Sequence, residues 1–280
     1  MPLEVVPICA YSARESFADP ILQRFASLRD ISHQDGILRK SILESVSRAT
    51  QMGHPDFAHL PLGGSGTCMG VTAFIDMAAF TARTFWDDPQ DVLWLNMAVL
   101  TQVAKTVQGF GGHVLGLRGD GVFACFGDKR MADMKVAAGA CVAACAFILD
   151  GAKGPLNEAL EARGMEPVRL RAGADFGDLS FVRIGTETAS EVNVVGFAAN
   201  FASKCEKHAG AWGLVVGEEL ASLLPESDIS LHEQSPKRYV RKGEERRYRF
   251  YDVSLPVYLK LGELVQEQLN GRPLSAIVPH

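Results

Sequence analysis

Paired cysteines, a targeting segment and a membrane-length apolar run are all missing from this sequence. The six cysteines form no C-x-x-C pair and mostly lie in apolar stretches, which is typical of reduced thiols in a protein core. The N-terminus, MPLEVVPICAYSARE, lacks the basic region of a secretory signal. The longest apolar run, 137–149, is too short to span a bilayer and predicts a tightly packed core helix. These absences predict a cytoplasmic protein without membrane insertion.

An excess of positive charge is also absent. The chain has 28 Lys and Arg against 33 Asp and Glu, a formal net charge of −5, which argues against a nucleic acid partner. The GGSG at 63–66 is not followed by the Gly-Lys-Ser/Thr of a phosphate loop. Neither an H-E-x-x-H zinc motif nor a G-x-S-x-G nucleophile motif occurs. An anionic ligand would therefore need local cations or a metal ion to hold it.

Periodicity and turn residues predict an α+β fold. Asp88 is a good helix N-cap, Pro89 suits a first turn and Gly111 would end that helix, while an Asp-Gly turn at 120–121 predicts a hairpin. The expected order is a strand at 70–77, a helix at 88–111, hairpins at 113–127 and 168–185 with a helix at about 130–150 between them, a helix at 198–210, and strands at 211–219 and 246–253. Two helices on one face of a mostly antiparallel sheet would form a ferredoxin-like core.

Three regions are expected along the chain. Residues 1–65 are predicted to form a helical N-terminal extension, with helical periodicity around 37–49. Residues 66–255 would form the main domain, and 256–280 a C-terminal tail packed on it.

Two aspartates end neighbouring apolar strands. Asp76 closes GVTAFID, and Asp120 lies at the tip of HVLGLRGDGVFACFG. If these strands are neighbours, the two carboxylates lie at one sheet end, where they repel unless a cation lies between them. Mg²⁺ or Mn²⁺ prefers oxygen ligands and leaves room for phosphates. The alternative is that Asp76 caps a helix and Asp120 is an ordinary turn residue.

Four ordered motifs resemble the class III nucleotidyl cyclases. These are FIDMAAFT, GLRGDGVFACFG, LRAGADFGDLSFVRIG and VVGFAANFASKCEKHAG, in an order and spacing similar to that family from about residue 70 to 253. The resemblance implies a ferredoxin-like cyclase catalytic domain. It also implies attack of a ribose 3′-hydroxyl on the α-phosphate of the same nucleotide, with two Mn²⁺ or Mg²⁺ ions per site.

The resemblance assigns roles residue by residue. Asp76 and Asp120 match the metal ligands, with the carbonyl of Met77 as a third ligand. Asn200 matches the asparagine that orients the ribose, and Lys204 replaces an arginine that stabilises the reacting phosphorus. The triphosphate would contact Lys242, with Arg241 as a rival, and the backbone amides of Ala78, Ala79, Phe80 and Thr81. A solvated turn is the alternative interpretation of RKGEERR at 241–247.

The resemblance also implies a head-to-tail homodimer. The metal aspartates would come from one protomer, and Asn200 and Lys204 from its partner. Each dimer would then hold two sites.

The positions that read the base depart from both purine patterns. At the first of these positions adenylate cyclases carry Lys and guanylate cyclases carry Glu, whereas this chain has Gly116. At the second position the usual residues are Asp for adenine and Cys for guanine, whereas this chain has Asn193. Strand alternation places Arg118 on the same face as Gly116. Its guanidinium only donates, which suits the carbonyls of uracil, whereas Asn193 both donates and accepts.

This combination resembles the Pycsar pyrimidine cyclases of bacterial antiphage defence. The implied reaction converts a pyrimidine nucleoside triphosphate to a 3′,5′-cyclic monophosphate that acts on a separate effector protein. UTP is the favoured substrate and CTP is the second choice. Two alternatives stay open: an adenylate cyclase with unusual base readers, and a catalytically degenerate dimer that binds nucleotide.

Overall fold

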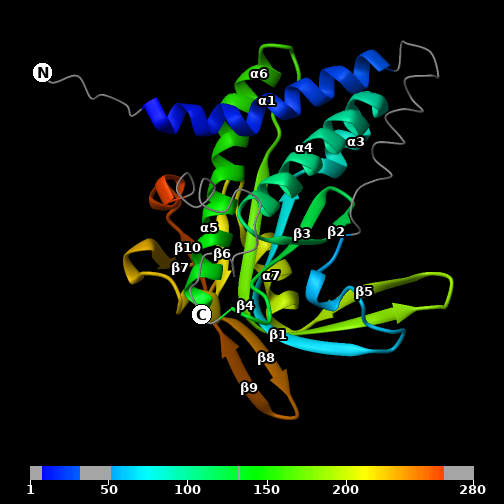
Figure 1. The fold of residues 1–280 in the computed structure, drawn as a ribbon. Helices are drawn as coiled ribbons and strands as arrows, with labels where there is room; N and C mark the ends of the chain where they lie inside the picture. The colour runs from blue at the N-terminus through cyan, green and yellow to red at the C-terminus, as the bar shows by residue number, and fades with distance from the viewer. Residues whose placement is uncertain (1–7, 32–51, 132, 262–280) are drawn as a thin grey trace, which may run out of the picture.

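The computed structural model describes residues 8–31, 52–131 and 133–261 (Figure 1). One mixed sheet of eight strands runs through the protein in the order β2-β3-β1-β4-β6-β10-β7, and β5 pairs with the far end of β4. All pairings are antiparallel except that of β4 with β6. The strands are β1 (Ser65–Met77), β2 (His113–Arg118), β3 (Gly121–Phe126), β4 (Leu170–Gly185), β5 (Ser190–Val195), β6 (Leu214–Gly217), β7 (Ile229–Leu231) and β10 (Phe250–Val253).

Helices cover both faces of this sheet, and not one face alone as the sequence predicted. They are α1 (Ile8–Ile31), α3 (Phe80–Trp86), α4 (Pro89–Gly109), α5 (Met134–Gly151), α6 (Asn157–Glu161), α7 (Phe197–His208) and α8 (Glu218–Ala221), with short 3-10 or π turns at Pro55–Phe57, Ala152–Leu156 and Glu226–Asp228. The core residues of α4 and α5 pack with Ala172 and Ala174 of β4 on one face, and α1 lies across these helices (Figure 1). On the other face α7 packs against β4 beside Leu179 and Phe181.

Local sequence explains the ends of α4, as predicted. The Asp88 side chain accepts hydrogen bonds from the backbone N–H groups of Gln90 (2.9 Å) and Asp91 (3.2 Å), and Pro89 occupies the first turn. The helix ends at Gly109, and Gly111 adopts a φ of 74°, a conformation that glycine permits.

The prediction of a hairpin at 168–185 was wrong. These residues form the single 16-residue strand β4, and the hairpin lies further on, between β4 and β5. Two glycines of this strand allow α7 to approach. A Cβ on Gly173 would lie 1.9 Å from the backbone nitrogen of Glu206, and one on Gly177 would lie 3.2 Å from the Cβ of Ala198.

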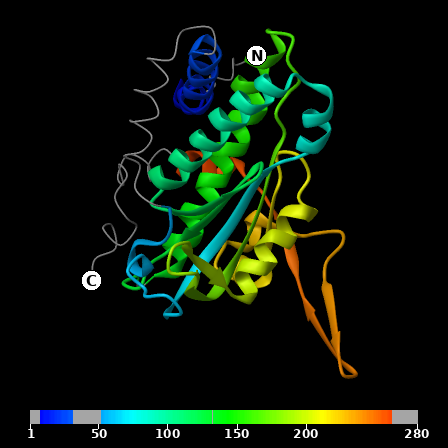
Figure 2. The ribbon, with the colours of Figure 1, turned by 90° about the vertical axis from the view of Figure 1, so that its right-hand side faces the viewer.

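The strand predicted at 246–253 was also wrong, because it is split between two sheets. β9 (Glu244–Tyr248) pairs with β8 (Lys237–Arg241) in a separate hairpin, and β10 begins at Phe250 in the main sheet. The hairpin turns at Lys242 and Gly243, whose φ angles of 51° and 82° both lie in the left-handed region. Figure 2 shows this hairpin extending away from the body of the protein.

Two regions bear on the expected extension and tail. The helix expected at 37–49 lies outside the described residues. Tyr258, near the start of the expected tail, is buried against the main core. The three domain boundaries stay predictions.

The apolar run at 137–149 lies in a core helix, as predicted. Among the described residues, the continuous helical stretch Met134–Glu161 alone is long and apolar enough to cross a membrane, and 72% of its most apolar window is buried inside the protein. Its Ala and Cys side chains allow α4 and the sheet to pack closely against it.

One carboxylate lies completely inside the fold. Asp175 of β4 is 0% exposed and accepts hydrogen bonds from the N–H groups of Phe176 (2.9 Å) and Leu220 (3.4 Å) and from the hydroxyl of Tyr248. Burial is the main cause that raises the pKa of Asp175 to about 7, and nearby Glu219 raises it further, while the hydrogen bonds lower it.

The buried carboxyl makes stability depend on pH. Because the folded state holds the Asp175 proton more tightly than the unfolded chain, the stabilisation present below pH 4 is lost as the pH rises through about 7. We expect the free energy of unfolding of the wild type to fall, relative to that of Asp175→Asn, by up to about 4 kcal/mol between pH 4 and pH 8. Denaturant unfolding of both proteins across this range measures the difference; parallel curves would contradict the assignment.

The contact between β4 and α7 gives a second test. Gly173→Ala would place a methyl group against the α7 backbone, so we expect the free energy of unfolding to fall by about 3 kcal/mol. Gly154→Ala is the matched control, because a Cβ there meets nothing within 4 Å. Equal stability of the two variants in urea unfolding would show that α7 does not pack as described.

Candidate active site

Asp76 and Asp120 lie side by side at one end of the sheet. Asp76 is the penultimate residue of β1 and pairs with Gly121 of β3. Asp120 precedes Gly121, in a two-residue turn with Gly119 that lies one residue earlier than the predicted Asp-Gly turn. The carbonyl of Asp120 accepts a hydrogen bond from the N–H of Met77 (3.3 Å). The pairing of β1 with β3 therefore fixes the distance between the two carboxylates.

The pKa of Asp120 lies above its ordinary value. Partial burial is the larger cause, and the charge and hydrogen bonding of Asp76 add to it. Gly121 makes room for this arrangement, since a Cβ there would lie 2.9 Å from Oδ1 of Asp76. A cation placed between the two carboxylates would therefore stabilise their ionised forms.

A basic side chain already contacts one of the two carboxylates. Arg171 of β4 lies opposite Asp76 in the β1–β4 register, and its guanidinium is 3.2 Å from Oδ2 of Asp76. The same guanidinium is 2.6 Å from Oε1 of Glu206 on α7. The side chains of Arg171 and Asp76 are about a quarter exposed, and that of Glu206 is 7% exposed. Arg171 therefore links the acidic pair to α7 and holds a partly accessible positive charge beside it.

The donor atoms around the acidic pair are of the kind that bind a divalent cation. Two neighbouring carboxylates and a backbone carbonyl are oxygen ligands of the kind that Mg²⁺ and Mn²⁺ prefer. Within the described part of the chain, no group of three or more His, Cys, Asp or Glu side chains is arranged to hold a metal. A cation here would therefore use Asp76, Asp120 and the Met77 carbonyl, and would leave positions open for phosphate oxygens.

The expected phosphate-binding segment follows β1 directly. Ala79 adopts a φ of 61° before α3 begins at Phe80, and among the described backbone contacts the amides of Ala79, Phe80 and Thr81 donate to no carbonyl. The amide of Ala78 instead donates to the carbonyl of Arg169 (2.7 Å). A cavity of about 350 Å³ opens beside this segment, lined by residues 77–80, 82, 83, 86, 87 and 166–169.

The other residues predicted to act on the ribose and the phosphates lie on elements that do not carry the acidic pair. Asn200 and Lys204 lie exposed on α7, and Arg241 and Lys242 lie at the tip of the β8–β9 hairpin. A second cavity of about 450 Å³ adjoins this tip, lined by Tyr239, Arg241, Lys242, Glu244 and Arg246. Within the described residues, no side-chain hydrogen bond or ion pair joins this group to Asp76 or Asp120. The head-to-tail dimer that would bring the groups together stays a prediction.

Comparisons with known proteins show similarity to cyclases in sequence and in fold. No family model matches the chain. Among curated proteins it is similar to a cytidylate cyclase of Escherichia coli (24% identical over 225 residues, 74% of this chain and 49% of the relative) and one of Staphylococcus aureus (25% over 174 residues, 61% and 41%). The chain thus spans about half the length of the curated relatives it matches.

Solved structures show the same architecture. The adenylyl cyclase CyaB from P. aeruginosa matches with a TM-score of 0.59 and 24% identity, over 68% of this chain and 95% of that one. The guanylyl cyclase Cya2 matches with a TM-score of 0.57 and 18% identity, over 68% and 93%. The chain has the class III nucleotidyl cyclase fold. The predicted fold class and the resemblance to cyclases are confirmed.

Within this cyclase fold, two of the predicted base-reading residues, Gly116 and Arg118, lie on the β2–β3 hairpin, and an ion pair links Arg118 to β5, the strand that carries Asn193. The guanidinium of Arg118 lies over Gly116, where a Cβ would be 3.8–3.9 Å from its atoms, so it occupies the space that a larger residue would fill. Its Nη2 lies 3.5 Å from Oε1 of Glu191 on β5. Asn193, two residues further on β5, uses Oδ1 to accept a hydrogen bond from the N–H of Val194 (2.8 Å).

The sequence analysis missed Arg171 and Glu206. An arginine at the start of a strand was the available signal, but the β1–β4 register that places it opposite Asp76 cannot be read from the sequence. Glu206 follows Lys204 by two residues and turns toward the sheet, where Gly173 leaves room for the α7 backbone.

Removal of the Arg171 charge tests this arrangement. In Arg171→Met the carboxylates of Asp76 and Glu206 lose their shared cation, so we expect the free energy of unfolding to fall by about 3 kcal/mol at neutral pH. Arg163→Met is the control, because Arg163 lies exposed in the turn after α6, and among the described residues its side chain donates to the carbonyl of Ala159 alone. Chemical denaturation of both variants gives the comparison, and an unchanged Arg171→Met would refute a structural role for this cation.

Proposed function

We propose that this chain is a nucleotidyl cyclase that converts a pyrimidine nucleoside triphosphate to its 3′,5′-cyclic monophosphate and pyrophosphate. The observation that carries the proposal is the placement of Asp76 and Asp120 side by side, next to the segment 78–81. The class III cyclase fold and the similarity to two cytidylate cyclases support it.

The proposed reaction is an in-line displacement at the α-phosphorus. The ribose 3′-oxygen forms a bond to this phosphorus and loses its proton to solvent, while the bond to the bridging oxygen breaks and pyrophosphate leaves with the electron pair. Mg²⁺ or Mn²⁺, two per site, would lower the pKa of the hydroxyl and neutralise phosphate charge when bound.

The chain itself supplies position and charge. Asp76, Asp120 and the Met77 carbonyl hold the cation site, and the amides of Ala79, Phe80 and Thr81 face the phosphates. Arg171 adds a positive charge that the triphosphate shares with Asp76. Asn200 orients the ribose, Lys204 stabilises charge at the phosphorus, and Lys242 or Arg241 contacts the leaving pyrophosphate.

The base is proposed to be a pyrimidine. Arg118 over Gly116 narrows the pocket and offers donors to base carbonyls, which favours UTP. The names of the curated relatives favour CTP. Asn193 can pair with the edge of either base.

The proposal includes the setting of the reaction. The two groups of residues would meet in a head-to-tail homodimer with two sites, in the cytoplasm. The cyclic nucleotide would act as a second messenger in antiphage defence by activating a separate effector protein.

A panel of the four nucleoside triphosphates with Mn²⁺ tests the activity. We expect mass spectrometry to detect cyclic UMP or cyclic CMP as the main product. Asp76→Asn and Asp120→Asn should each reduce the rate by roughly 100-fold or more while the protein stays folded, because each loses a cation ligand.

The control variant is Asp178→Asn, an exposed carboxylate elsewhere on β4. Cyclic AMP as the main product would instead support an adenylate cyclase with unusual base readers. Nucleotide binding without any cyclic product would support a degenerate binding dimer.

A further inference from the structure

The β8–β9 hairpin is a basic arm with few attachments to the body. Residues 237–249 contain seven basic and two acidic side chains, in a chain whose net charge is negative. Among the described strands, β8 and β9 pair only with each other. The arm is therefore not held by the main sheet, and its direction depends on side-chain contacts at its root.

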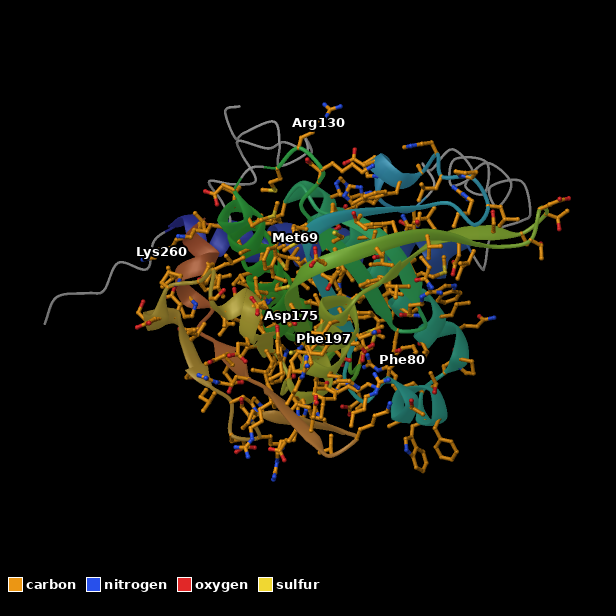
Figure 3. The ribbon with its side chains drawn as sticks, turned by 90° about the horizontal axis from the view of Figure 1, so that it is seen from below. Met69, Phe80, Arg130, Asp175, Phe197 and Lys260 are labelled. Atoms are coloured by element: carbon orange, nitrogen blue, oxygen red, sulfur yellow. The ribbon has the colours of Figure 1, made fainter. Side chains whose placement is uncertain are left out.

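Tyr248, the last residue of β9, contacts both α7 and the core at this root, where Arg249 also pairs with Glu218 and Tyr239 packs against Phe197. The ring of Tyr248 packs edge-on against Phe197 and Phe201 of α7, with centroid distances of 4.8 and 4.6 Å. Its hydroxyl lies 3.0 and 3.2 Å from the two carboxylate oxygens of Asp175 and accepts a hydrogen bond from the N–H of Glu219 (3.1 Å). Figure 3 labels Asp175 and Phe197, two of the residues that Tyr248 contacts.

The partner of Tyr248 is rigidly held. Asp175 is completely buried, and Gly217 of β6 packs so closely that a Cβ there would lie 2.3 Å from its carboxylate carbon. The hydrogen bond between Tyr248 and Asp175 thus lies in a buried site of low dielectric constant, where it is electrostatically stronger than in water. Tyr248 thus joins three elements at one point: the arm, α7 and the core of the sheet.

The arm amplifies any movement at this point. Lys242 lies six residues from Tyr248, which is about 20 Å along an extended strand. A rotation of about 10° at the root would therefore move the tip by about 3.5 Å, which is more than a hydrogen bond tolerates.

We propose that Tyr248 and Asp175 form a clasp that positions the arm relative to α7. The clasp fixes the position of Arg241 and Lys242, at the tip, relative to α7. The nucleotide would then bind these two residues together with Asn200 and Lys204 of α7. Tyr248 and Asp175 are positioning residues, since neither touches the substrate. The inference rests on the proposed function in assigning the tip to the triphosphate.

Tyr248→Phe tests the clasp, because it keeps the ring and removes only the hydroxyl. We expect KM for the preferred nucleotide to rise about tenfold, with a smaller change in kcat. Asp175→Asn, whose amide still accepts a hydrogen bond, should raise KM less. Tyr251→Phe is the control, since it removes a tyrosine hydroxyl from β10 that makes no contact of this kind among the described residues.

A double-mutant cycle separates positioning from general destabilisation. In an Arg241→Ala, Lys242→Ala background the tip no longer binds phosphate, so Tyr248→Phe should add almost nothing to KM. Equal effects in both backgrounds, or an unchanged KM in Tyr248→Phe, would overturn the clasp.

A measurement independent of catalysis keeps the two proposals distinguishable. Amide hydrogen exchange of peptides covering 218–220 and 237–249 should be faster in Tyr248→Phe than in the wild type and the Tyr251→Phe control. Faster exchange without any cyclic product from the wild type would support the clasp and refute the proposed function. Unchanged exchange would refute the clasp whatever the activity.

Discussion

The repulsion between two neighbouring carboxylates is the constraint around which this end of the fold is arranged. The β1–β3 register brings Asp76 and Asp120 together, and the β1–β4 register places Arg171 against Asp76. Glycine opposite Asp76 makes the approach sterically possible. Burial and the neighbouring charge of Asp76 both disfavour the ionised form of Asp120, and a cation placed between the two carboxylates would relieve this cost.

α7 turns this local site into part of a larger one. It faces the sheet through Glu206, which bonds Arg171, and faces the arm through Phe197 and Phe201. Its exposed side carries Asn200 and Lys204. One helix of 12 residues therefore connects the acidic pair, the basic arm and the residues expected to act on a neighbouring protomer's nucleotide.

The sequence predicted those parts of the structure that depend on local signals. The N-cap at Asp88, the β2–β3 hairpin and the buried helix α5 follow from capping, turn and burial rules, and the ordered motifs indicated the cyclase fold. The parts it did not predict depend on packing between distant segments. Glycines in β4, where a hairpin was predicted, allow contact with α7. The roles of Arg171 and Tyr248 follow from strand register and from a buried carboxylate, which no window of sequence reveals.

The separation of β8 and β9 from the main sheet has a consequence for solubility. Each strand leaves a row of backbone N–H and C=O groups without a strand partner among the described residues, and such rows recruit strands from other molecules. The density of lysine and arginine along both strands opposes this, because two such hairpins repel each other before their backbones can pair. The positive charges proposed to bind the triphosphate thus also oppose edge-to-edge aggregation.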